Sequence, residues 1–306
     1  MSRTTTAAAA FALVGALSLS ACGGGGPDPL ATSSSGSAQG GAGEVVVGSA
    51  DFSESILLAH IYAGALEADG VNATTRTNIG SREIYLKALE DGSVDVMPEY
   101  TGALAVYYDK TFSETDPEKV YSGLQKELPE GLTVLEKSAA EDKDSIAVSR
   151  KTADEKNLTT IDDLEPVAGE LTLGAPSEFQ NREQGVKGLK SQYGVEFGQF
   201  RALKGAALVN ALKNGQVHAA NLFSTDPNIA ANDFVVLEDE KNLFGSQNVV
   251  PLVTTDVEEQ VSPSLNKVSK ALTTEKLTAM LQKTDIDKED PEKVADEFLE
   301  DEGITS

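Results

Sequence analysis

The sequence predicts a two-lobed α/β protein, in which two sheets are joined by a two-strand hinge and a ligand cleft lies between the lobes. A helix-strand unit occurs twice at an offset of 123 residues, which is far longer than a solenoid period and indicates duplicated lobes. Strand-then-helix patterns, typical of α/β sheets, restart midway along the chain. The helical residues 262–299 have no second counterpart, so we expect the chain to return to the first lobe there.

The repeated unit reads ALEDGSVDVMPEYTG from Ala88 and ALKNGQVHAANLFST from Ala211. Both copies have a Gly that can adopt the positive φ of a helix C-cap, then a short strand, then an aromatic ring, Tyr100 or Phe223. Each ring would lie at the C-terminal end of its strand, where open α/β sheets hold ligands. The alternative interpretation is a chance match of common helix-turn-strand patterns.

The first lobe is expected to begin with a buried strand at 44–48 and a helix that starts at Ser53 and stops at Gly70. A second strand at 71–78 and the first copy of the repeat follow. The next patterns predict helices at 102–108 and 117–128 and a strand at 133–135.

The second lobe is expected to restart this order. A strand at 145–148 leaves the first lobe, a strand at 171–173 leads into a helix at 182–193, and strands at 234–237 and 249–253 follow the second copy of the repeat. Two crossings, near Ser145 and Val250, make a hinge, and a hinged two-lobed molecule can close on a small ligand. The predicted limits are 44–146 and 251–306 for the first lobe and 147–250 for the second.

The first 43 residues predict a signal and a tether. An apolar run at 7–19, too short to span a bilayer comfortably, leads into Leu19-Ser20-Ala21-Cys22. This resembles the lipobox of bacterial lipoproteins, which implies removal of residues 1–21 and a diacylglycerol on Cys22. An ordinary secretory signal with an unrelated Cys is the alternative. Residues 22–43 are mostly Gly, Ser, Ala, Pro and Thr and are predicted to be a flexible tether.

Composition excludes several classes of function. Cys22 is the only cysteine, so we expect no disulfide within the chain, no cysteine zinc site and no thiol catalysis. The formal net charge of −24 argues against binding nucleic acid and against lying flat on anionic lipid. We therefore expect a monomer held at the extracytoplasmic face of the cell membrane by its lipid alone, with its body in solution.

Catalytic patterns are missing from the sequence. The two histidines, His60 and His218, are better interpreted as structural residues, and no hydrolase or zinc motif is present. We expect no enzyme, no cofactor and no metal site.

Polar and aromatic residues at two junctions suggest ligand binding. Tyr100 is predicted at a strand-to-helix junction, where Thr101 and the first helix amides would offer a polar surface. Either Tyr100 or Phe223 could instead be a core ring. Arg182 is predicted at a helix start, where the helix dipole disfavours a cation, so an anionic partner is expected. That partner would be a ligand group or, in the alternative, Glu178 or Glu183.

These residues and their neighbours resemble the substrate-binding lipoproteins of osmoprotectant ABC importers, over about residues 44–299. The resemblance implies a type II periplasmic-binding-protein fold with two mixed sheets. It also implies binding of glycine betaine, choline, carnitine or proline betaine and delivery to a permease driven by an ATPase. The motifs are Gly48-Ser49-Ala50-Asp51-Phe52-Ser53-Glu54, Glu99-Tyr100-Thr101-Gly102, Glu178-Phe179-Gln180-Asn181-Arg182, Gly188-Leu189-Lys190 with Tyr193-Gly194, and Ser224-Thr225-Asp226.

The resemblance also implies a pocket. Aromatic faces hold a trimethylammonium group, and an Arg holds the carboxylate of a ligand that has one. Tyr100 falls at one cage position, Phe223 at another where Tyr is usual, and Arg182 at the place of the carboxylate-binding Arg, with Glu178 a turn before it. The predicted ligand-binding set is Tyr100, Arg182, Phe223, Glu178, Asp144, Gln247, Thr101, Asp51 and Thr225.

Besides Phe223, four positions depart from the family pattern. Asp144 and Gln247 stand where two further cage tyrosines are expected, and Ala50 and Ala103 replace a usual Lys and a frequent Thr. Losing two aromatic walls of roughly 1–2 kcal/mol each would weaken a quaternary ammonium ligand by about thirty- to a thousandfold. Asp144 could then supply a counter-charge to a cation, and Gln247 could hydrogen-bond a more polar solute.

The leading hypothesis is a lipid-anchored solute receptor of an ABC importer for an osmoprotectant. Three alternatives stay open: a receptor for a different polar or aromatic solute, a solute sensor without transport, and an enzyme on the same fold.

Overall fold

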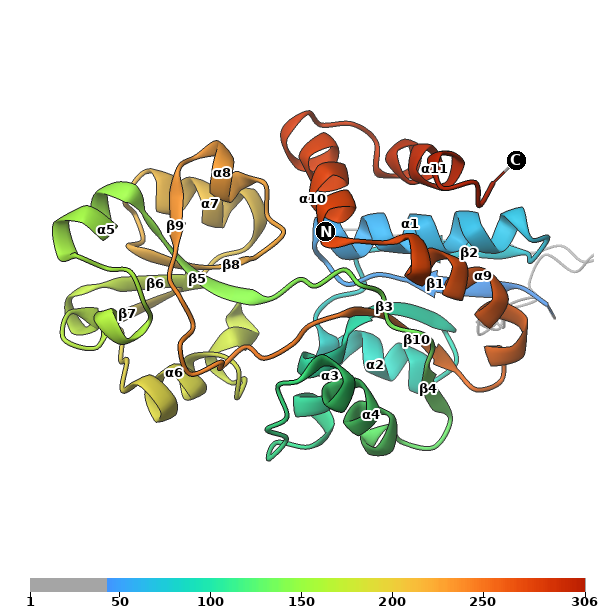
Figure 1. The fold of residues 1–306 in the computed structure, drawn as a ribbon, viewed down its shortest axis with the longest axis horizontal. Helices are drawn as coiled ribbons and strands as arrows, with labels where there is room; N and C mark the ends of the chain where they lie inside the picture. The colour runs from blue at the N-terminus through green and yellow to red at the C-terminus, as the bar shows by residue number, and fades with distance from the viewer. Residues whose placement is uncertain (1–42, 306) are drawn as a thin grey trace, which may run out of the picture. The chain divides into compact units, whose positions relative to one another are not determined.

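The computed structural model describes residues 43–305, which form two five-stranded sheets (Figure 1). Residues 1–42, with the predicted signal, Cys22 and nearly all of the tether, lie outside the described residues. The strands of the first sheet are β1 (Val45–Gly48), β2 (Ala73–Arg76), β3 (Val96–Tyr100), β4 (Leu132–Val134) and β10 (Val249–Thr254). Those of the second are β5 (Asp144–Ser149), β6 (Thr172–Ala175), β7 (Gln199–Ala202), β8 (Ala219–Phe223) and β9 (Phe234–Val236).

Both sheets are mixed and have the same plan. The strand order is β2-β1-β3-β10-β4 in the first and β7-β6-β8-β5-β9 in the second. In each, one strand runs antiparallel to its two neighbours: β10 in the first sheet and β5 in the second. These are the strands by which the chain enters each sheet from the other. The prediction of two mixed α/β sheets is confirmed.

The repeated unit has the same place in both sheets. Helix α2 (Arg82–Glu90) precedes β3, and helix α7 (Gly205–Lys213) precedes β8, with every bound shifted by 123 residues. Both strands are central, parallel to a β1- or β6-type neighbour and antiparallel to the entering strand. The match between the two stretches is therefore more than a chance similarity of sequence.

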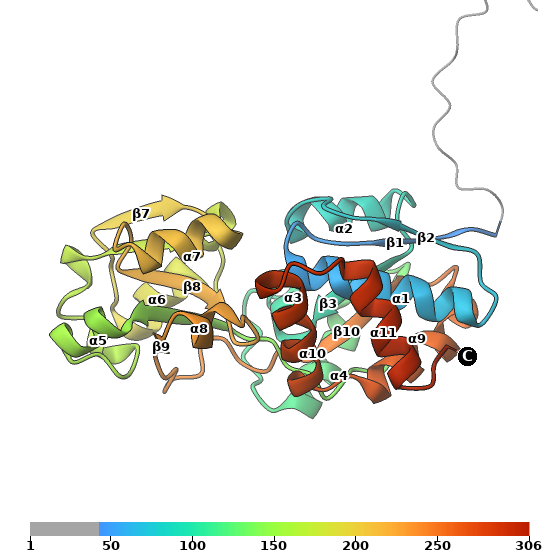
Figure 2. The same cartoon turned by 90° about the horizontal axis from the view of Figure 1, so that it is seen from above.

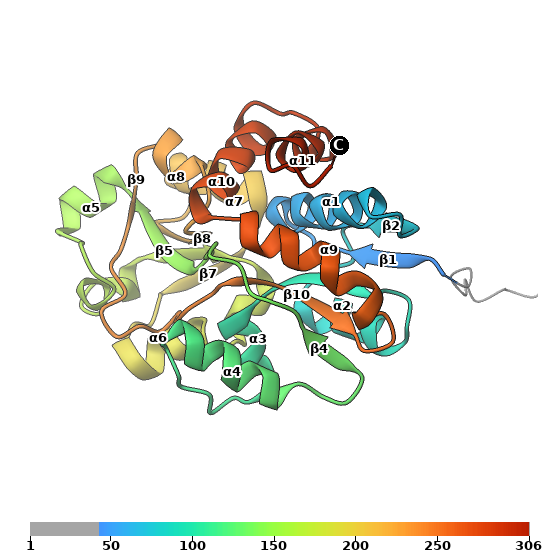
Figure 3. The same cartoon turned by 45° about the vertical axis from the view of Figure 1, so that its right-hand side comes forward.

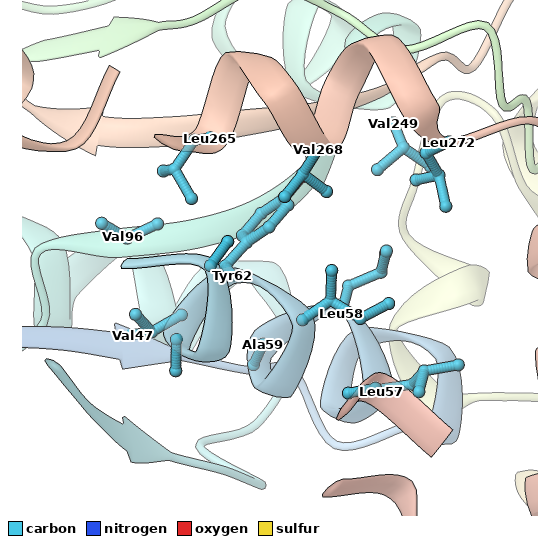
Figure 4. Close-up of a cluster of buried hydrophobic side chains, with 14 of the residues drawn as sticks. Val47, Leu57, Leu58, Ala59, Tyr62, Val96, Val249, Leu265, Val268 and Leu272 are labelled. Atoms are coloured by element: carbon cyan, nitrogen blue, oxygen red, sulfur yellow. The ribbon is translucent and has the colours of Figure 1, made fainter. Parts of the chain in front are cut away.

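The first sheet and its helices, which we call lobe 1, bury helix α1 (Ser53–Ala68) most deeply. Helices α9 (Glu258–Ala271) and α11 (Pro291–Asp301) both pack on α1, and α9 also contacts β10 of the sheet (Figures 2 and 3). Figure 4 shows Leu58 and Tyr62 of α1 among Val96 of the sheet and Val268 of α9. Because α1 is covered on several sides, its apolar residues occupy most of its circumference. The other helices of lobe 1 are α3 (Thr101–Tyr108), α4 (Pro117–Glu127), α9 (Glu258–Ala271), α10 (Thr274–Leu281) and α11 (Pro291–Asp301), with a π-helical turn at Gln282–Ile286.

The second sheet and its helices form lobe 2, which has separate hydrophobic cores. Helix α6 (Val186–Tyr193) begins four residues later than the predicted 182–193, so Arg182 does not stand at a helix start. A tight turn precedes α6, and a Cβ added at Gly185 would lie 2.1 Å from the Phe179 carbonyl oxygen. The remaining elements are α5 (Arg150–Lys156), α8 (Asn228–Ala231) and 3₁₀ helices at Asp162–Leu164, Ala168–Glu170 and Ser177–Gln180.

Two segments, 135–143 and 237–248, connect the lobes and pair with each other near lobe 1. The Asp142 N–H donates to the Gln247 carbonyl at 3.0 Å, and Glu141 forms an antiparallel β-bridge with Asn248. The predicted lobe limits at 146/147 and 250/251 fall inside β5 and β10, because the hydrogen bonds of each sheet extend over the whole of its entering strand. The connections therefore precede Ser145 and Val250.

Candidate functional site

A cavity of about 820 Å³ lies between the lobes, where the central strands β3 and β8 end. Its volume lies within the roughly 300–1,000 Å³ range of small-molecule sites. Of the predicted ligand-binding residues, Thr101 does not line this cavity. The ones that do are Asp51, Tyr100, Asp144, Glu178, Arg182, Phe223, Thr225 and Gln247.

Three aromatic rings form a row across the cleft. Phe52, immediately before α1, lies 6.3 Å from Tyr100 and 5.3 Å from Phe223, measured between ring centroids. The Phe52 and Phe223 rings are nearly parallel, with 27° between their planes. Tyr100 belongs to lobe 1 and Phe223 to lobe 2, so Phe52 joins the two rings at the ends of the repeated units. The prediction that both rings face one cleft agrees with this arrangement.

Two buried carboxyl groups meet beside Tyr100. Glu54 accepts hydrogen bonds from the Tyr100 hydroxyl at 2.7 Å and from the Thr225 hydroxyl at 2.6 Å. Asp142, in a connecting segment, lies 2.8 Å from the same Thr225 hydroxyl oxygen and accepts from the Thr225 backbone N–H at 3.2 Å. Burial raises the pKa of Glu54 to about 7, although the hydrogen bonds from Thr225 and Tyr100 act in the opposite direction. Burial, followed by the charge of Glu54, raises the pKa of Asp142 well above its ordinary value.

Asp144 begins β5 and faces the cavity from the second sheet. Its carboxylate accepts from the Asn221 side-chain amide at 2.8 Å. Burial raises the pKa of Asp144, and the Asn221 hydrogen bond and the charges of Arg182 and Arg82 oppose that shift. A cationic group in this part of the cleft would therefore meet a carboxyl group that is already close to two guanidinium groups.

Arg82 is a cavity residue that the sequence interpretation missed. Its Nε and Nη2 atoms donate to the two oxygens of Glu99 at 2.7 and 2.9 Å, and both side chains are buried. The Tyr85 hydroxyl and the Tyr100 backbone N–H donate to the same carboxylate. This bidentate pair holds β3 against α2 directly below Tyr100. Within residues 43–305 the Nη1 atom of Arg82 donates no hydrogen bond.

Arg182 pairs across the cleft. Its Nε atom lies 3.5 Å from Glu83 of α2, whereas the sequence alternatives were Glu178 and Glu183. Those two residues are close in sequence, but the turn before α6 directs Arg182 toward lobe 1. Glu178 lines the cavity and accepts from the Ser177 hydroxyl at 3.1 Å.

The start of α3 is closed off by the second connecting segment. The Gln247 side-chain oxygen accepts from the Ala103 N–H at 2.8 Å, and the Asn248 carbonyl accepts from the Thr101 N–H at 3.0 Å. The Thr101 hydroxyl oxygen accepts from the Asn248 N–H at 3.1 Å. A Cβ at Gly102 would lie 2.4 Å from the Ser246 carbonyl oxygen, so this close approach requires glycine. The expected polar surface at the helix start is therefore occupied by protein, and Thr101 is structural.

Asp51 forms an ion pair with Lys204, which precedes α7. Together with the Arg182–Glu83 and Thr225–Glu54 contacts, this pair links lobe 1 to lobe 2 around the three rings.

The sequence interpretation missed five cavity residues that matter to this geometry. Phe52 and Glu54 lie in the quoted Asp51-Phe52-Ser53-Glu54 motif, next to Asp51, so a signal for them was present. No local pattern distinguishes the others from ordinary polar residues, because their partners are distant in sequence. The five are Phe52, Glu54, Arg82, Asp142 and Asn221.

Neither histidine lines the cavity. The His218 ring accepts from the Thr172 N–H at 3.1 Å, which supports the structural interpretation. Among residues 43–305 there is no group of three or more His, Cys, Asp or Glu side chains arranged to hold a metal ion. In the same range, no helix combines the length and apolar character needed to cross a membrane.

Comparison with known proteins agrees with this geometry. A family described as the substrate binding domain of ABC-type glycine betaine transport systems matches residues 43–301. A carnitine transport binding protein of Listeria monocytogenes is 27% identical over 262 residues, covering 83% of this chain and 85% of that protein. A glycine-betaine-binding protein of Pseudomonas aeruginosa is 26% identical, covering 83% and 86%.

Solved structures with a similar fold belong to the same class of proteins. A crystal structure described as a glycine betaine/carnitine/choline ABC transporter superimposes with a TM-score of 0.67 at 26% identity, covering 85% of this chain and 99% of that one. The fold is therefore that of type II periplasmic binding proteins, and the predicted fold and family resemblance are confirmed.

Proposed function

Because the chain belongs to the family of substrate-binding domains of ABC-type glycine betaine transport systems, we propose that its cleft binds a small quaternary ammonium solute or a related zwitterionic or cationic osmoprotectant. As the substrate-binding protein of an ABC importer, it acts outside the cytoplasm and delivers its ligand to a permease that is driven by an ATPase. The proteins that it matches are transport binding proteins and not enzymes, and we propose no catalytic step. The observation that carries the ligand class is the row of three rings from both lobes beside buried carboxyl groups.

The rings suit a trimethylammonium group. Such a group has no N–H to donate and a diffuse charge, so aromatic faces hold it at about 0.5–2 kcal/mol each. Phe52 and Phe223, at 5.3 Å, are in direct contact, so the cation would not lie between them. It would lie against their free faces and the face of Tyr100.

The charges around the cavity also favour a cationic group. Seven acidic and four basic residues line it, and three of the four bases are paired with carboxylates: Arg82 with Glu99, Arg182 with Glu83, and Lys204 with Asp51. The cavity therefore has an excess of negative groups beside the rings.

A ligand carboxylate, where present, would be bound by Arg182. Its contact with Glu83 is long, and its side chain is 30% exposed, so a carboxylate with better geometry could take the place of Glu83. The unbonded Nη1 of Arg82 would be a second donor on the same side, because both guanidinium groups act on Asp144.

Calorimetric titration of the purified protein with glycine betaine, carnitine and choline tests this proposal. We expect saturable binding of at least one of the three. Arg182→Gln should weaken the two carboxylate-bearing ligands by about ten- to a hundredfold and leave choline little changed, since choline has no carboxylate. Absence of binding with all three ligands would remove the proposed ligand class.

The attachment of the protein to the cell surface is also a proposal. Support comes from the lipobox-like Leu19-Ser20-Ala21-Cys22 and from the acidic composition, which disfavours direct contact with anionic lipid. We infer a monomeric lipoprotein, anchored through Cys22 with lobes 1 and 2 free in solution. Replacement of Cys22 by Ala should release the protein from the membrane fraction.

A further inference from the structure

The hydroxyl of Thr225 lies between two carboxyl groups and cannot satisfy both as a donor. Its oxygen is 2.6 Å from Glu54 Oε2 and 2.8 Å from Asp142 Oδ1. A hydroxyl has one proton to donate, so the other short contact needs a proton on a carboxyl group. Without that proton, two negatively charged oxygens would face one hydroxyl inside a buried site.

The surrounding donors indicate which carboxyl group holds the proton. Glu54 accepts from the Tyr100 hydroxyl on one oxygen and from Thr225 on the other, which suits a carboxylate. Asp142 Oδ1 accepts from the Thr225 backbone N–H and lies against the Thr225 hydroxyl, whereas Oδ2 is buried without a hydrogen-bond partner within residues 43–305. A carboxyl group with one buried oxygen left unpaired is better suited to the neutral acid than to the carboxylate. The arrangement with all short contacts satisfied is a chain in which Asp142 donates to Thr225 and Thr225 donates to Glu54.

We propose that Glu54 is the counter-charge for the cationic group of the bound solute, and that Glu54 releases one proton when the solute binds. Asp142, held as a carboxylic acid, orients the Thr225 hydroxyl toward Glu54. This inference rests on the proposed function, because it assigns a role to residues of the same cleft. Both carboxyl groups line the cavity, and Glu54 accepts a hydrogen bond from the hydroxyl of Tyr100, whose ring the cation would contact.

Within residues 43–305 no Lys or Arg side chain is paired with Glu54, and Lys288, which follows the π-helical turn and lines the cavity, donates instead to the Asp285 backbone carbonyl at 2.6 Å. The π-helical turn brings Asp285, which is bonded to Ser53, and β3 brings Tyr100. From lobe 2 come Thr225 and Asp226, and the connecting segment brings Asp142, with Asp144 two residues further on. A cation from solution is therefore the group that would compensate a charge on Glu54.

The pH dependence follows from the position of Glu54. The carboxylate form of Glu54 described above is the form present above its pKa, which burial raises to about 7, so near pH 6 Glu54 also holds a proton in the empty site and a cation must displace it. The affinity for a cation should therefore rise with pH. Between pH 6 and pH 8 the expected gain is about tenfold, with about one proton released for each ligand bound at pH 6.

Calorimetric titration with choline at pH 6 and pH 8 tests the proposal, because choline carries a permanent charge and no titrating group in this range. Proton release is read from the binding enthalpy in two buffers of different ionisation enthalpy. In the wild-type protein we expect affinity about tenfold higher at pH 8 and release of about one proton at pH 6.

Two isosteric variants separate the roles of the carboxyl groups. Glu54→Gln should weaken choline binding at pH 8 and abolish both the pH dependence and the proton release. Asp142→Asn keeps a donor to Thr225, so its ratio of affinities between the two pH values should stay near ten. A thermal melt of each variant checks that it is folded, and the proton count of the wild-type protein decides the question if either variant fails to fold.

The outcomes distinguish this inference from the proposed function. Choline binding with no proton release, or an unchanged pH dependence in Glu54→Gln, would overturn the counter-charge role and leave the receptor role intact. Loss of the pH dependence in Asp142→Asn would overturn the assignment of the proton to Asp142. Failure of choline, glycine betaine and carnitine to bind at pH 8 would overturn the proposed ligand class and this inference with it.

Discussion

The two copies of the repeated unit occupy the same place in their sheets but end in different chemistry. In the first copy, Tyr100 is buried, its hydroxyl donates to Glu54, and Glu99 before it is held by Arg82. In the second copy, Phe223 is half-buried, has no polar atom in its ring, and follows the apolar Leu222. The duplicated backbone thus supports an anchored ring in lobe 1 and a less restrained ring in lobe 2.

This difference indicates how the cleft works. Lobe 1 holds the Tyr100 ring in place through a network of buried charged groups. Lobe 2 contributes Phe223, which contacts the Phe52 ring, and the Thr225 hydroxyl, which donates to Glu54. Glu54 connects the two lobes, because it accepts one hydrogen bond from Tyr100 of lobe 1 and one from Thr225 of lobe 2. The following experiments alter one side at a time, beginning with the largest expected effect.

Glu99→Leu gives the first copy the residue that the second copy has at the equivalent position, Leu222, and should be the most destabilising change. It leaves the Arg82 guanidinium, which is 7% exposed, without its partner, so the free energy of unfolding should fall by about 3–5 kcal/mol. Urea unfolding followed by circular dichroism measures the loss. The double variant Arg82→Leu/Glu99→Leu should recover most of it, and a single variant as stable as wild type would show that the pair does not anchor β3.

The buried carboxyl group of Glu54 should make the stability of the protein depend on pH. The pKa of Glu54 is raised from 4.5 to about 7, so the folded protein binds more protons than the unfolded chain between these values. The folding stability that comes from this bound proton is fully present below pH 4.5 and is lost as the pH rises through 7. The loss amounts to up to about 3 kcal/mol. Urea unfolding between pH 4.5 and pH 8 should therefore show a steeper decline for wild type than for Glu54→Gln. Parallel curves would contradict the buried position of this carboxyl group.

The ring between the two copies can be removed with little change in volume. Phe52→Leu should weaken glycine betaine by about tenfold, because one aromatic face of up to about 2 kcal/mol is replaced by an alkyl group. Phe112→Leu is the matched control, since Phe112 packs on Gly123 and does not line the cavity. Calorimetry that gives equal affinities for the two variants would exclude Phe52 from the ligand site.

A reciprocal exchange of the end residues should have the smallest effect. Tyr100→Phe removes the donor to Glu54 and should cost about 1 kcal/mol of folding stability. Phe223→Tyr adds a hydroxyl to a half-buried ring and should change stability by less than about 0.5 kcal/mol. Thermal unfolding of both variants measures the contrast, and equal losses would show that the two ends are anchored alike.

Much of the fold could be predicted because its signals are local. The apolar period of α1, the Gly stop of each repeat and the position of Tyr100 and Phe223 after short strands all depend on neighbours within a few residues. The same reasoning failed for Arg182, where the chain forms a 3₁₀ helix and a turn before α6 that helix periodicity does not distinguish from a helix.

The candidate site was predicted only in part for a related reason. A local pattern can place a side chain at the end of a strand, but it cannot name the group opposite. Gln247 was expected to contact solute, yet its amide caps α3, 144 residues away in sequence. Arg82 was missed because its partner Glu99 belongs to the next strand and neither residue is unusual in its own segment.

The sequence by itself determined the two-lobed α/β plan, the duplication and the rings at the ends of β3 and β8, because backbone geometry links each of these to a short-range pattern of apolar residues and glycine. Only the tertiary structure decided that Glu54 meets Thr225, 171 residues away, and that Phe52 lies between Tyr100 and Phe223. Those contacts depend on sheet register and on the pairing of the two connecting segments, and no stretch of neighbouring residues specifies either.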